Sequence, residues 1–176
     1  MRKVIAVEYV SLDGVMENPA WTMPFWNDEI AKSQGDIMEA SGALLLGRVT
    51  YQGFAAAWPK MAGQPGADKM NSMPKHVASR TLKEMEWHAD LIQGDVVEGV
   101  QKLKEGPGEN LLIYGSAGLI KTLMEHDLID VYRLLVYPVV VGAGKRLFSE
   151  GINKTFKLID AQPTNSGVII TTYERA

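Results

Sequence analysis

The stretch that decides the fold is "LLIYGSAGLIKTL", Leu111 to Leu123. Its apolar start is typical of a strand buried in a sheet, and its second half begins a helix, with the small residues Gly115 and Ser116 between them. A strand that runs through a short turn into a helix is the repeating unit of parallel sheets. The turn itself leaves two interpretations open. It is either a cradle of backbone N–H groups for a phosphate or a tight connection between packed elements.

The same alternation of strand and helix recurs upstream of this stretch, and it gives way to consecutive strands downstream. Strands are predicted at 4–10, 43–47, 75–79, 87–92 and 110–114, and helices at 27–41, 48–58, 94–106 and 117–126. A long apolar strand over 129–140 is followed by two strands near 155–162 and 167–174. The pattern predicts a single α/β domain over 1–176. It has one mixed, mostly parallel sheet of about eight strands, with helices on both faces and a C-terminal antiparallel hairpin.

The composition excludes several classes of function for this chain. The chain has 176 residues, 46% hydrophobic and 22% charged, with a net charge of −3 and no cysteine. This balance gives no general attraction to nucleic acid or to an anionic membrane, and the lack of cysteine excludes disulfides and thiolate chemistry. The apolar run at the N-terminus is too short for a signal sequence or a membrane span and is interrupted by Glu8. We expect a cytoplasmic protein whose partner is a small molecule.

Two further strand ends carry residues suited to an anion. "LLLGRVTY" places Gly47, Arg48 and Thr50 where a strand meets a helix, and "VASRTL" places Ser79 and Arg80 just after another strand. In open α/β sheets, ligands bind at the carboxyl ends of strands, where helix N-termini offer free N–H groups. Each segment alone is also compatible with a solvated arginine and a capping hydroxyl. Three such strand ends together indicate a dinucleotide stretched along the edge of the sheet.

Two other loops stay ambiguous at this level. Asp13 and Gly14 form a turn after the first strand, which is a common role for Asp-Gly but also borders the expected reaction centre. "VVVGAGKRLF", 139–148, is either a basic anion-binding loop or a plain glycine turn. The three histidines have no metal-ligand spacing, so no metal site is predicted.

Several of these segments together resemble the dihydrofolate-reductase-like superfamily. They are "SLDG", "LLLGRVTYQGFAAAWP", "KHVASRTL" and "LIYGSAGLIKTLMEHDLIDVYRLLVYPVVVGAGKRLF". The branch they resemble is the reductase domain of bacterial riboflavin biosynthesis and its stand-alone relatives. This resemblance covers Val4 to Tyr173 and implies an αβα three-layer sandwich that binds NADPH.

The resemblance also implies which residues bind the cofactor. Phosphates would lie against the Gly47–Thr50 segment, the adenosine 2′-phosphate near Ser79 and Arg80, and the nicotinamide beside the loop of Asp13 and Gly14. The predicted cofactor-binding residues are therefore Gly14, Gly47, Arg48, Val49, Thr50, Ser79, Arg80, Gly115, Ser116, Ala117, Gly118 and Leu119. Folate reductases join two glycines by a cis peptide at the central turn, where this chain has Gly115-Ser116.

The substrate side departs from folate reductases, which present a carboxylate from their first helix to the pterin. On a helical wheel, Ile30, Ala31, Ile37 and Met38 define the predicted inward face, and Gln34 is the polar residue that shares it. Asp28, Glu29, Asp36 and Glu39 fall away from that face. Because a glutamine supplies no negative charge, dihydrofolate is not the expected substrate.

The sequence thus predicts an NADPH-dependent reductase that transfers hydride to a small pterin- or pyrimidine-like heterocycle. Asp13 and Gln34 are its candidate catalytic residues, and the proton comes from ordered water or from Asp13. Two alternatives stay open: a non-catalytic NADPH-binding sensor, and another oxidoreductase with a Rossmann-type sheet. The resemblance further implies a homodimer, with the apolar strand 131–141 as a contributor to its interface.

Overall fold

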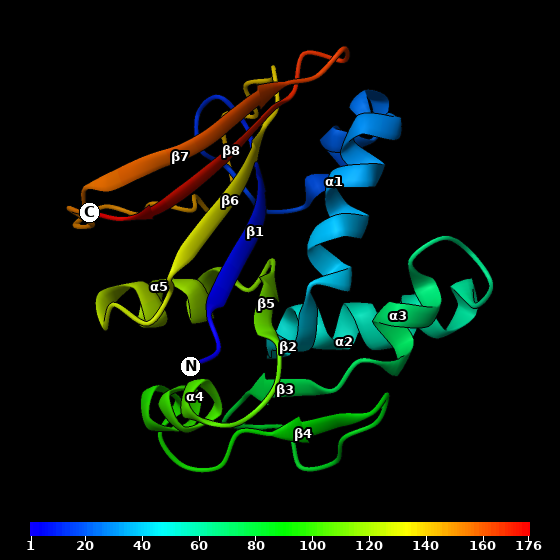
Figure 1. Cartoon of the computed structure of the whole chain (residues 1–176), viewed down its shortest axis with the longest axis vertical. Helices are drawn as coiled ribbons and strands as arrows, with labels where there is room; N and C mark the ends of the chain where they lie inside the picture. Colours follow the sequence, from blue (N-terminus) through cyan, green and yellow to red (C-terminus); the bar gives the residue numbers. More distant parts are fainter.

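The computed structural model describes all 176 residues and builds them around one eight-stranded sheet (Figure 1). The strands are β1 Val4–Val10, β2 Ser41–Gly47, β3 Lys75–Ala78, β4 Ala89–Leu91, β5 Asn110–Tyr114, β6 Val131–Val136, β7 Phe156–Pro163 and β8 Ile169–Arg175. The α-helices are α1 Asp28–Glu39, α2 Arg48–Ala57, α3 Ala67–Ser72, α4 Val96–Glu105 and α5 Ala117–Glu125. Two 3₁₀ helices, η1 Pro19–Phe25 and η2 Trp58–Met61, complete the chain.

The strand order is β4-β3-β2-β5-β1-β6-β8-β7, so β1 lies inside the sheet between β5 and β6. Strands β1 to β6 are parallel to one another, and β8 runs antiparallel to both β6 and β7. The final strand is therefore inserted between β6 and the edge strand β7. This arrangement confirms the predicted mixed sheet with its C-terminal hairpin, and it rules out the order of a Rossmann-type sheet.

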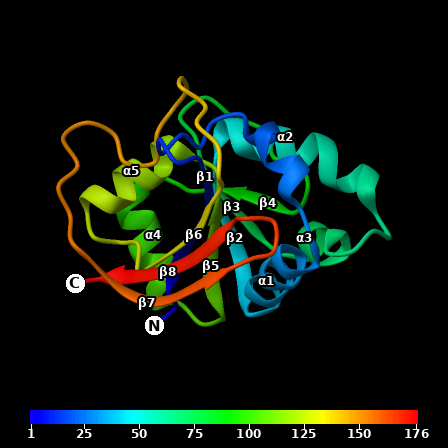
Figure 2. The same cartoon turned by 90° about the horizontal axis from the view of Figure 1, so that it is seen from above.

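Helices cover both faces of the sheet, which confirms the three-layer sandwich (Figure 2). On one face, α4 and α5 bury Val100, Ile120 and Leu123 against the strands. On the other, α1, α2 and α3 bury Ile30, Tyr51 and Met70. The central strands contribute to both cores because successive side chains point to opposite faces. None of the helices is both long and apolar enough to cross a lipid bilayer.

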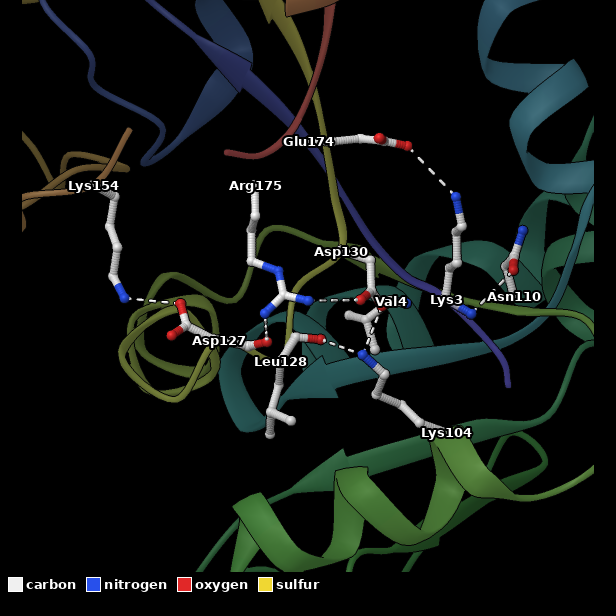
Figure 3. Close-up of polar contacts among 10 residues, drawn as sticks. All are labelled: Lys3, Val4, Lys104, Asn110, Asp127, Leu128, Asp130, Lys154, Glu174 and Arg175. Carbon is white, nitrogen blue, oxygen red and sulfur yellow. Dashed lines mark hydrogen bonds and ion pairs between the residues drawn. The ribbon is translucent and has the colours of Figure 1, made fainter. Parts of the chain in front are cut away.

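A group of ion pairs lies at the end of the sheet where β1 and β6 begin (Figure 3). The ammonium of Lys104 on α4 lies 2.6 Å from Asp130 Oδ2 and also donates to the carbonyl oxygen of Leu128. The same carboxylate oxygen accepts the Val4 amide at 2.8 Å, and Arg175 at the end of β8 reaches Oδ1 at 3.4 Å. Asp130 therefore joins α4, β1 and β8 at the end of the sheet that lies opposite the predicted cofactor site.

One strand boundary and one helix face differ from the sequence-based prediction. The strand predicted over 129–140 ends at Val136, because Pro138 has no N–H with which to continue the ladder. Since β6 is paired on both sides, it offers no free edge to a second subunit. On α1, the inward face consists of Ile30, Ser33, Gln34 and Met38. The predicted face included Ala31, which is exposed, and did not include Ser33.

Candidate functional site: the carboxyl edge of the parallel strands

The sheet places the predicted cofactor residues in a row at the carboxyl ends of its parallel strands. Strands β3, β2, β5 and β1 are successive neighbours and parallel, so their carboxyl ends lie in that order. Ser79 and Arg80 follow β3, Gly47 and Arg48 join β2 to α2, and the turn of Gly115 and Ser116 joins β5 to α5; Asp13 and Gly14 follow β1. The structure brings all of the predicted segments into one row, whose binding role stays a prediction.

Ser116 ties the two middle members of this row together. Its hydroxyl accepts a hydrogen bond from the Gly47 amide at 2.9 Å and donates one to the carbonyl oxygen of Tyr114 at 3.0 Å. Its own amide donates to Thr50 Oγ1 at 3.0 Å. The starts of α2 and α5 are therefore fixed to one another by side chains that the sequence predicted only as ligand contacts.

The turn adopts a conformation that needs its small residues. Gly115 and Ser116 both have left-handed backbones, with φ of 55° and 62°. A Cβ on Gly115 would lie 2.9 Å from Thr50 Oγ1, so a larger residue would displace the threonine that holds the turn. All peptide bonds of the chain are trans, including the bond between Gly115 and Ser116.

The two helices that begin here start differently from α1 and α4. Neither α2 nor α5 has a side-chain N-cap or an acidic residue in its first turn. By contrast, α1 is capped by Asn27 and α4 by Asp95, and both have acidic residues in the first turn. The first N–H groups of a helix carry partial positive charge and need an acceptor. At α2 and α5, the chain itself leaves that place open to an anion.

The exposed members of the row are suited to contact with a ligand. Arg48 is exposed and donates to Gln52 Oε1 at 3.2 Å, and its neighbour Val49 is 69% exposed. Arg80 is exposed and forms no ion pair within the chain, whereas the hydroxyl of Ser79 accepts from two amides that follow it, those of Thr81 and Leu82. A Cβ on Gly118 would meet no atom within 4 Å, so the start of α5 is open to solvent, while Leu119 is buried.

Asp13 links the loop after β1 to the loop after β6, a contact that the sequence did not predict. Its carboxylate accepts hydrogen bonds from the Ser11 hydroxyl and from the amides of Val141 and Gly142, at 2.5, 3.1 and 2.8 Å. These donors, Ser11 first, lower the pKa of Asp13 to about 2. The group is therefore ionised at neutral pH and carries no proton to deliver. The geometry makes it a clamp between two loops, contrary to the proton-donor role considered from the sequence.

The loop 139–148 also packs against the loop that follows β1. Arg146 pairs with Val15 in an isolated β-bridge, and the amides of Leu147 and Met16 complete the contact with the loop after β1. Gly144 has a φ of 121°, and a Cβ there would lie 2.9 Å from Val15 Cγ1. Gly144 thus allows the two loops to pack closely.

Gln34 does point into the protein, as predicted. It is 6% exposed, and its Oε1 accepts from the Tyr114 hydroxyl at 3.4 Å, while its Nε2 has no partner. Burial raises the pKa of Tyr114, and the nearby Glu8 acts in the same direction, so this hydroxyl remains a donor. None of the four acidic residues of α1 is buried, so the helix presents an amide to the sheet in place of a carboxylate.

Two charged residues inside strands were missed as candidates. Glu8 on β1 is 3% exposed and leaves Oε1 without a partner; burial raises its pKa well above the ordinary value, against the opposing effect of the Gly115 amide. Arg133 on β6 donates to the Ser33 hydroxyl at 2.8 Å, and its Nε is buried without a partner. A charge within an apolar strand was the available signal, since such residues are almost never buried without a reason.

These residues fit a dinucleotide. A diphosphate needs N–H donors and positive charge, which the two uncapped helix starts and Arg48 offer side by side. Arg80 lies at the β3 end of the row. The unpartnered Oε1 of Glu8 lies on the face of β1 that packs against α4 and α5, whereas the unpartnered Nε2 of Gln34 lies on the opposite face, on α1. The chain therefore offers donors for a long anionic ligand that follows the row of strand ends.

This sheet order, with its uncapped helices at the carboxyl edge, defines an αβα protein of the dihydrofolate-reductase-like type. Within that class, the model of the RibD C-terminal domain matches residues 2–170, so the chain belongs to the RibD C-terminal domain family. It is 30% identical to the uncharacterized protein YyaP of Bacillus subtilis over 98% of this chain and 94% of YyaP. It is 29% identical to YwjB of the same organism, over 88% and 87% of the two chains.

Solved structures share the fold. A putative riboflavin biosynthesis protein from Shewanella superposes with a TM-score of 0.81 at 24% identity, over 99% of both chains. A diaminohydroxyphosphoribosylaminopyrimidine deaminase/5-amino-6-(5-phosphoribosylamino)uracil reductase from Thermotoga maritima gives a TM-score of 0.71 at 14% identity. This chain matches 57% of that longer protein.

Proposed function

We propose that the protein is an NADPH-dependent reductase that transfers hydride to a small pterin- or pyrimidine-like heterocycle. The observation that carries this proposal is the pair of uncapped, acid-free helix starts, α2 and α5, fixed side by side by Ser116. The reductase named among the similar structures supports the reaction class. NADPH is favoured over NADH because Arg80 has no ion partner within the chain and is free to bind a 2′-phosphate.

The bound cofactor would supply the hydride, and the protein would supply orientation, exclusion of water and a proton. Of the two carboxyl groups near the end of β1, Asp13 is held ionised and Glu8 is favoured in its neutral form. Glu8 is therefore the carboxyl group near the end of β1 that would retain a proton, and it lies on the face of the sheet opposite to Gln34 and Arg133. Gln34 and Arg133 would orient the heterocycle through amide and guanidinium donors.

The proposal is tested by titrating the protein with NADPH and with NADH while following tryptophan fluorescence. Saturable binding of NADPH at micromolar concentration, with much weaker binding of NADH, is the expected result. Hydride transfer is then followed by stopped-flow loss of the reduced-nicotinamide absorbance across pterins, flavin precursors and imines. No saturable binding of either nucleotide at millimolar concentration would contradict the proposal.

A second candidate is a sensor that binds NADPH without turnover. The observation in its favour is the absence of a buried carboxylate from α1, which removes the anionic partner that folate reductases use. The two functions give the same titration but differ in the stopped-flow experiment. Tight NADPH binding with no oxidation in the presence of any substrate of the panel would favour the sensor.

A further inference from the structure

Polar side chains from two strands meet α1 above the middle of the sheet. On β1, Val7 pairs with Tyr114 of β5 and with Arg133 of β6. Paired residues of neighbouring strands point to the same face of a sheet, and Val7 belongs to the core on the α1 side. The Tyr114 hydroxyl donates to Gln34 Oε1 at 3.4 Å, and Arg133 Nη2 donates to Ser33 Oγ at 2.8 Å. We call Ser33, Gln34, Tyr114 and Arg133 the α1 polar group.

Aromatic side chains border this group toward the carboxyl ends of the strands. Tyr9 lies two residues beyond Val7 on β1 and therefore shares its face. Its ring centroid lies 5.6 Å from that of Tyr137, and Trp21 and Phe25 of η1 pack edge-on against the same ring at 5.6 and 5.9 Å. Because Tyr9, Trp21 and Phe25 are each partly exposed, this aromatic surface is open to a flat ring from solution.

Buried donors without an acceptor gather at the same place. Of the five buried side-chain N and O atoms that have no partner in the chain, three lie on this face: Gln34 Nε2, Arg133 Nε and the Tyr137 hydroxyl oxygen. An amide nitrogen and a guanidinium nitrogen can only donate. Buried polar groups nearly always form hydrogen bonds, so these donors indicate a partner rich in acceptor atoms.

The charges of this face are not balanced. Arg133 forms no ion pair within the chain, and none of the acidic residues of α1 is buried. The buried Glu8 lies on the opposite face of the sheet. Burial raises the pKa values of Tyr9 and Tyr114, so both phenols stay neutral at physiological pH. A partly buried guanidinium therefore lacks a counter-ion, and since buried charges are normally paired, an anion is the missing partner.

The geometry of Arg133 favours a carboxylate as this anion. A guanidinium presents parallel N–H groups that match the two oxygens of a carboxylate. Ser33 accepts from Nη2, and the buried Nε remains available. A carboxylate carries a single charge, which one guanidinium neutralises, whereas a phosphate dianion would leave a second charge in a partly buried place. The free donors of Gln34 and Tyr137 suit carbonyl oxygens on the same ligand.

We infer that the substrate is a heterocyclic carboxylate, whose carboxylate pairs with Arg133 while its ring oxygens accept from Gln34 and Tyr137. The inference rests on the proposed function in calling this ligand a substrate, but its binding at Arg133 requires no cofactor. Arg133 then determines specificity, because a neutral ring of the same shape leaves the guanidinium unpaired. The arrangement of charges is the reverse of that in folate reductases, where the first helix supplies the carboxylate.

Matched pairs of ligands test the inference. Orotate and uracil differ by one carboxylate, as do pterin-6-carboxylate and pterin. In calorimetric titrations of the wild-type protein at neutral pH, without nicotinamide, at least one carboxylate should bind about tenfold or more tightly than its neutral parent, because charge-assisted bidentate pairs are strong. Equal binding within both pairs, or no binding of either carboxylate at millimolar concentration, would overturn the inference.

Substitution of Arg133 assigns the preference to one side chain. Arg133→Met removes the charge and should abolish the preference, with less than about a twofold change for the neutral ring. Arg133→Lys keeps the charge without the planar fork and should recover part of the preference. Lys157→Met, at an exposed position on β7, removes one positive charge elsewhere and should change nothing. With circular dichroism showing that each variant is folded, a preference that survives in Arg133→Met would contradict the inference.

Two further titrations separate this inference from its competitors. Uridine 5′-phosphate carries its charge on a ribosyl phosphate. If it binds more tightly than orotate and loses that affinity in Arg133→Met, a phosphate occupies the place of the carboxylate and the inference is wrong. NADPH binding is measured separately by tryptophan fluorescence. NADPH binding without a carboxylate preference would refute this inference alone, whereas a carboxylate preference without NADPH binding would support it and refute the proposed function.

Discussion

Thr50 Oγ1 accepts the Ser116 amide at 3.0 Å, although the two residues lie on different strand–helix connections and are 66 positions apart. This bond joins the start of α2 to the start of α5. It converts two separate helix N-termini into one site with a fixed spacing.

Thr50→Val removes the acceptor and leaves the Ser116 amide unpaired in a half-buried turn. Loss of such a partner costs about 1–3 kcal/mol in the free energy of unfolding. We expect this loss in urea unfolding, together with weaker NADPH binding in the fluorescence titration. Thr122→Val, on the exposed side of α5, is the matched control because its hydroxyl donates only to a carbonyl within the helix. Equal effects of the two substitutions would show that the bond does not organise the site.

Arg80→Gln removes a positive charge from the β3 end of the row without changing a contact inside the protein. A hydrogen bond to a charged group contributes about 1.5–3 kcal/mol, so NADPH binding should weaken about tenfold to a hundredfold. Binding of NADH, which lacks the 2′-phosphate, should not change. The test is the ratio of the two dissociation constants, with Lys83→Gln as a control at an exposed position three residues away. A parallel loss for both nucleotides would place the 2′-phosphate elsewhere.

Gln34→Leu removes an amide whose Nε2 is buried and unpartnered. An unsatisfied buried polar group costs about 1–3 kcal/mol. The substitution removes that cost but also removes the acceptor of the Tyr114 hydroxyl at 3.4 Å, so the variant should unfold at a urea concentration close to that of the wild type. Its kcat/KM should nevertheless fall, because the amide no longer orients the substrate. Activity thus changes while stability does not. A variant that loses stability and keeps its activity would assign Gln34 a purely structural role.

Lys104→Met leaves the Asp130 carboxylate without its closest cation. The Lys104 and Asp130 side chains are 9% and 20% exposed, and breaking a buried pair by removing one partner costs about 3–5 kcal/mol. Because Arg175 still reaches Asp130, we expect the lower part of this range in urea unfolding. The control is Lys32→Met in the exposed pair with Asp36, where the change should stay below about 1 kcal/mol. Similar losses in both variants would contradict the importance of burial.

The sequence predicted the sheet well because its strand–helix units are local. Strands β1, β2 and β5 are apolar runs followed by a turn, and the residues at those turns fall at one end of the sheet by topology alone. The roles of individual polar groups depended on contacts between distant segments. Asp13 looked available until the amides of Val141 and Gly142 were placed against it, 128 and 129 positions along the chain. The bulge of β7, where Leu158 pairs with Tyr173 and Asp160 with Thr172, was equally hidden, because its register exists only relative to β8.

Glu8→Gln tests whether the buried carboxyl of β1 is neutral in the folded protein. Burial raises the pKa of Glu8 well above 4.5, whereas the unfolded chain has the ordinary value. Between these two pKa values the folded state binds one more proton than the unfolded state. The free energy of unfolding of the wild type therefore falls as pH rises through that window. Glutamine is neutral at every pH, so this contribution disappears in the variant.

The stability of Glu8→Gln minus that of the wild type should accordingly increase from pH 5 to pH 8 in urea unfolding. Other titrating groups, including Asp13, are present in both proteins and cancel in the difference. If Glu8 also delivers the proton, the variant binds NADPH normally but loses turnover at all pH values. A stability difference that does not change with pH would mean that Glu8 is ionised in the fold, and its role as a proton source would then be excluded.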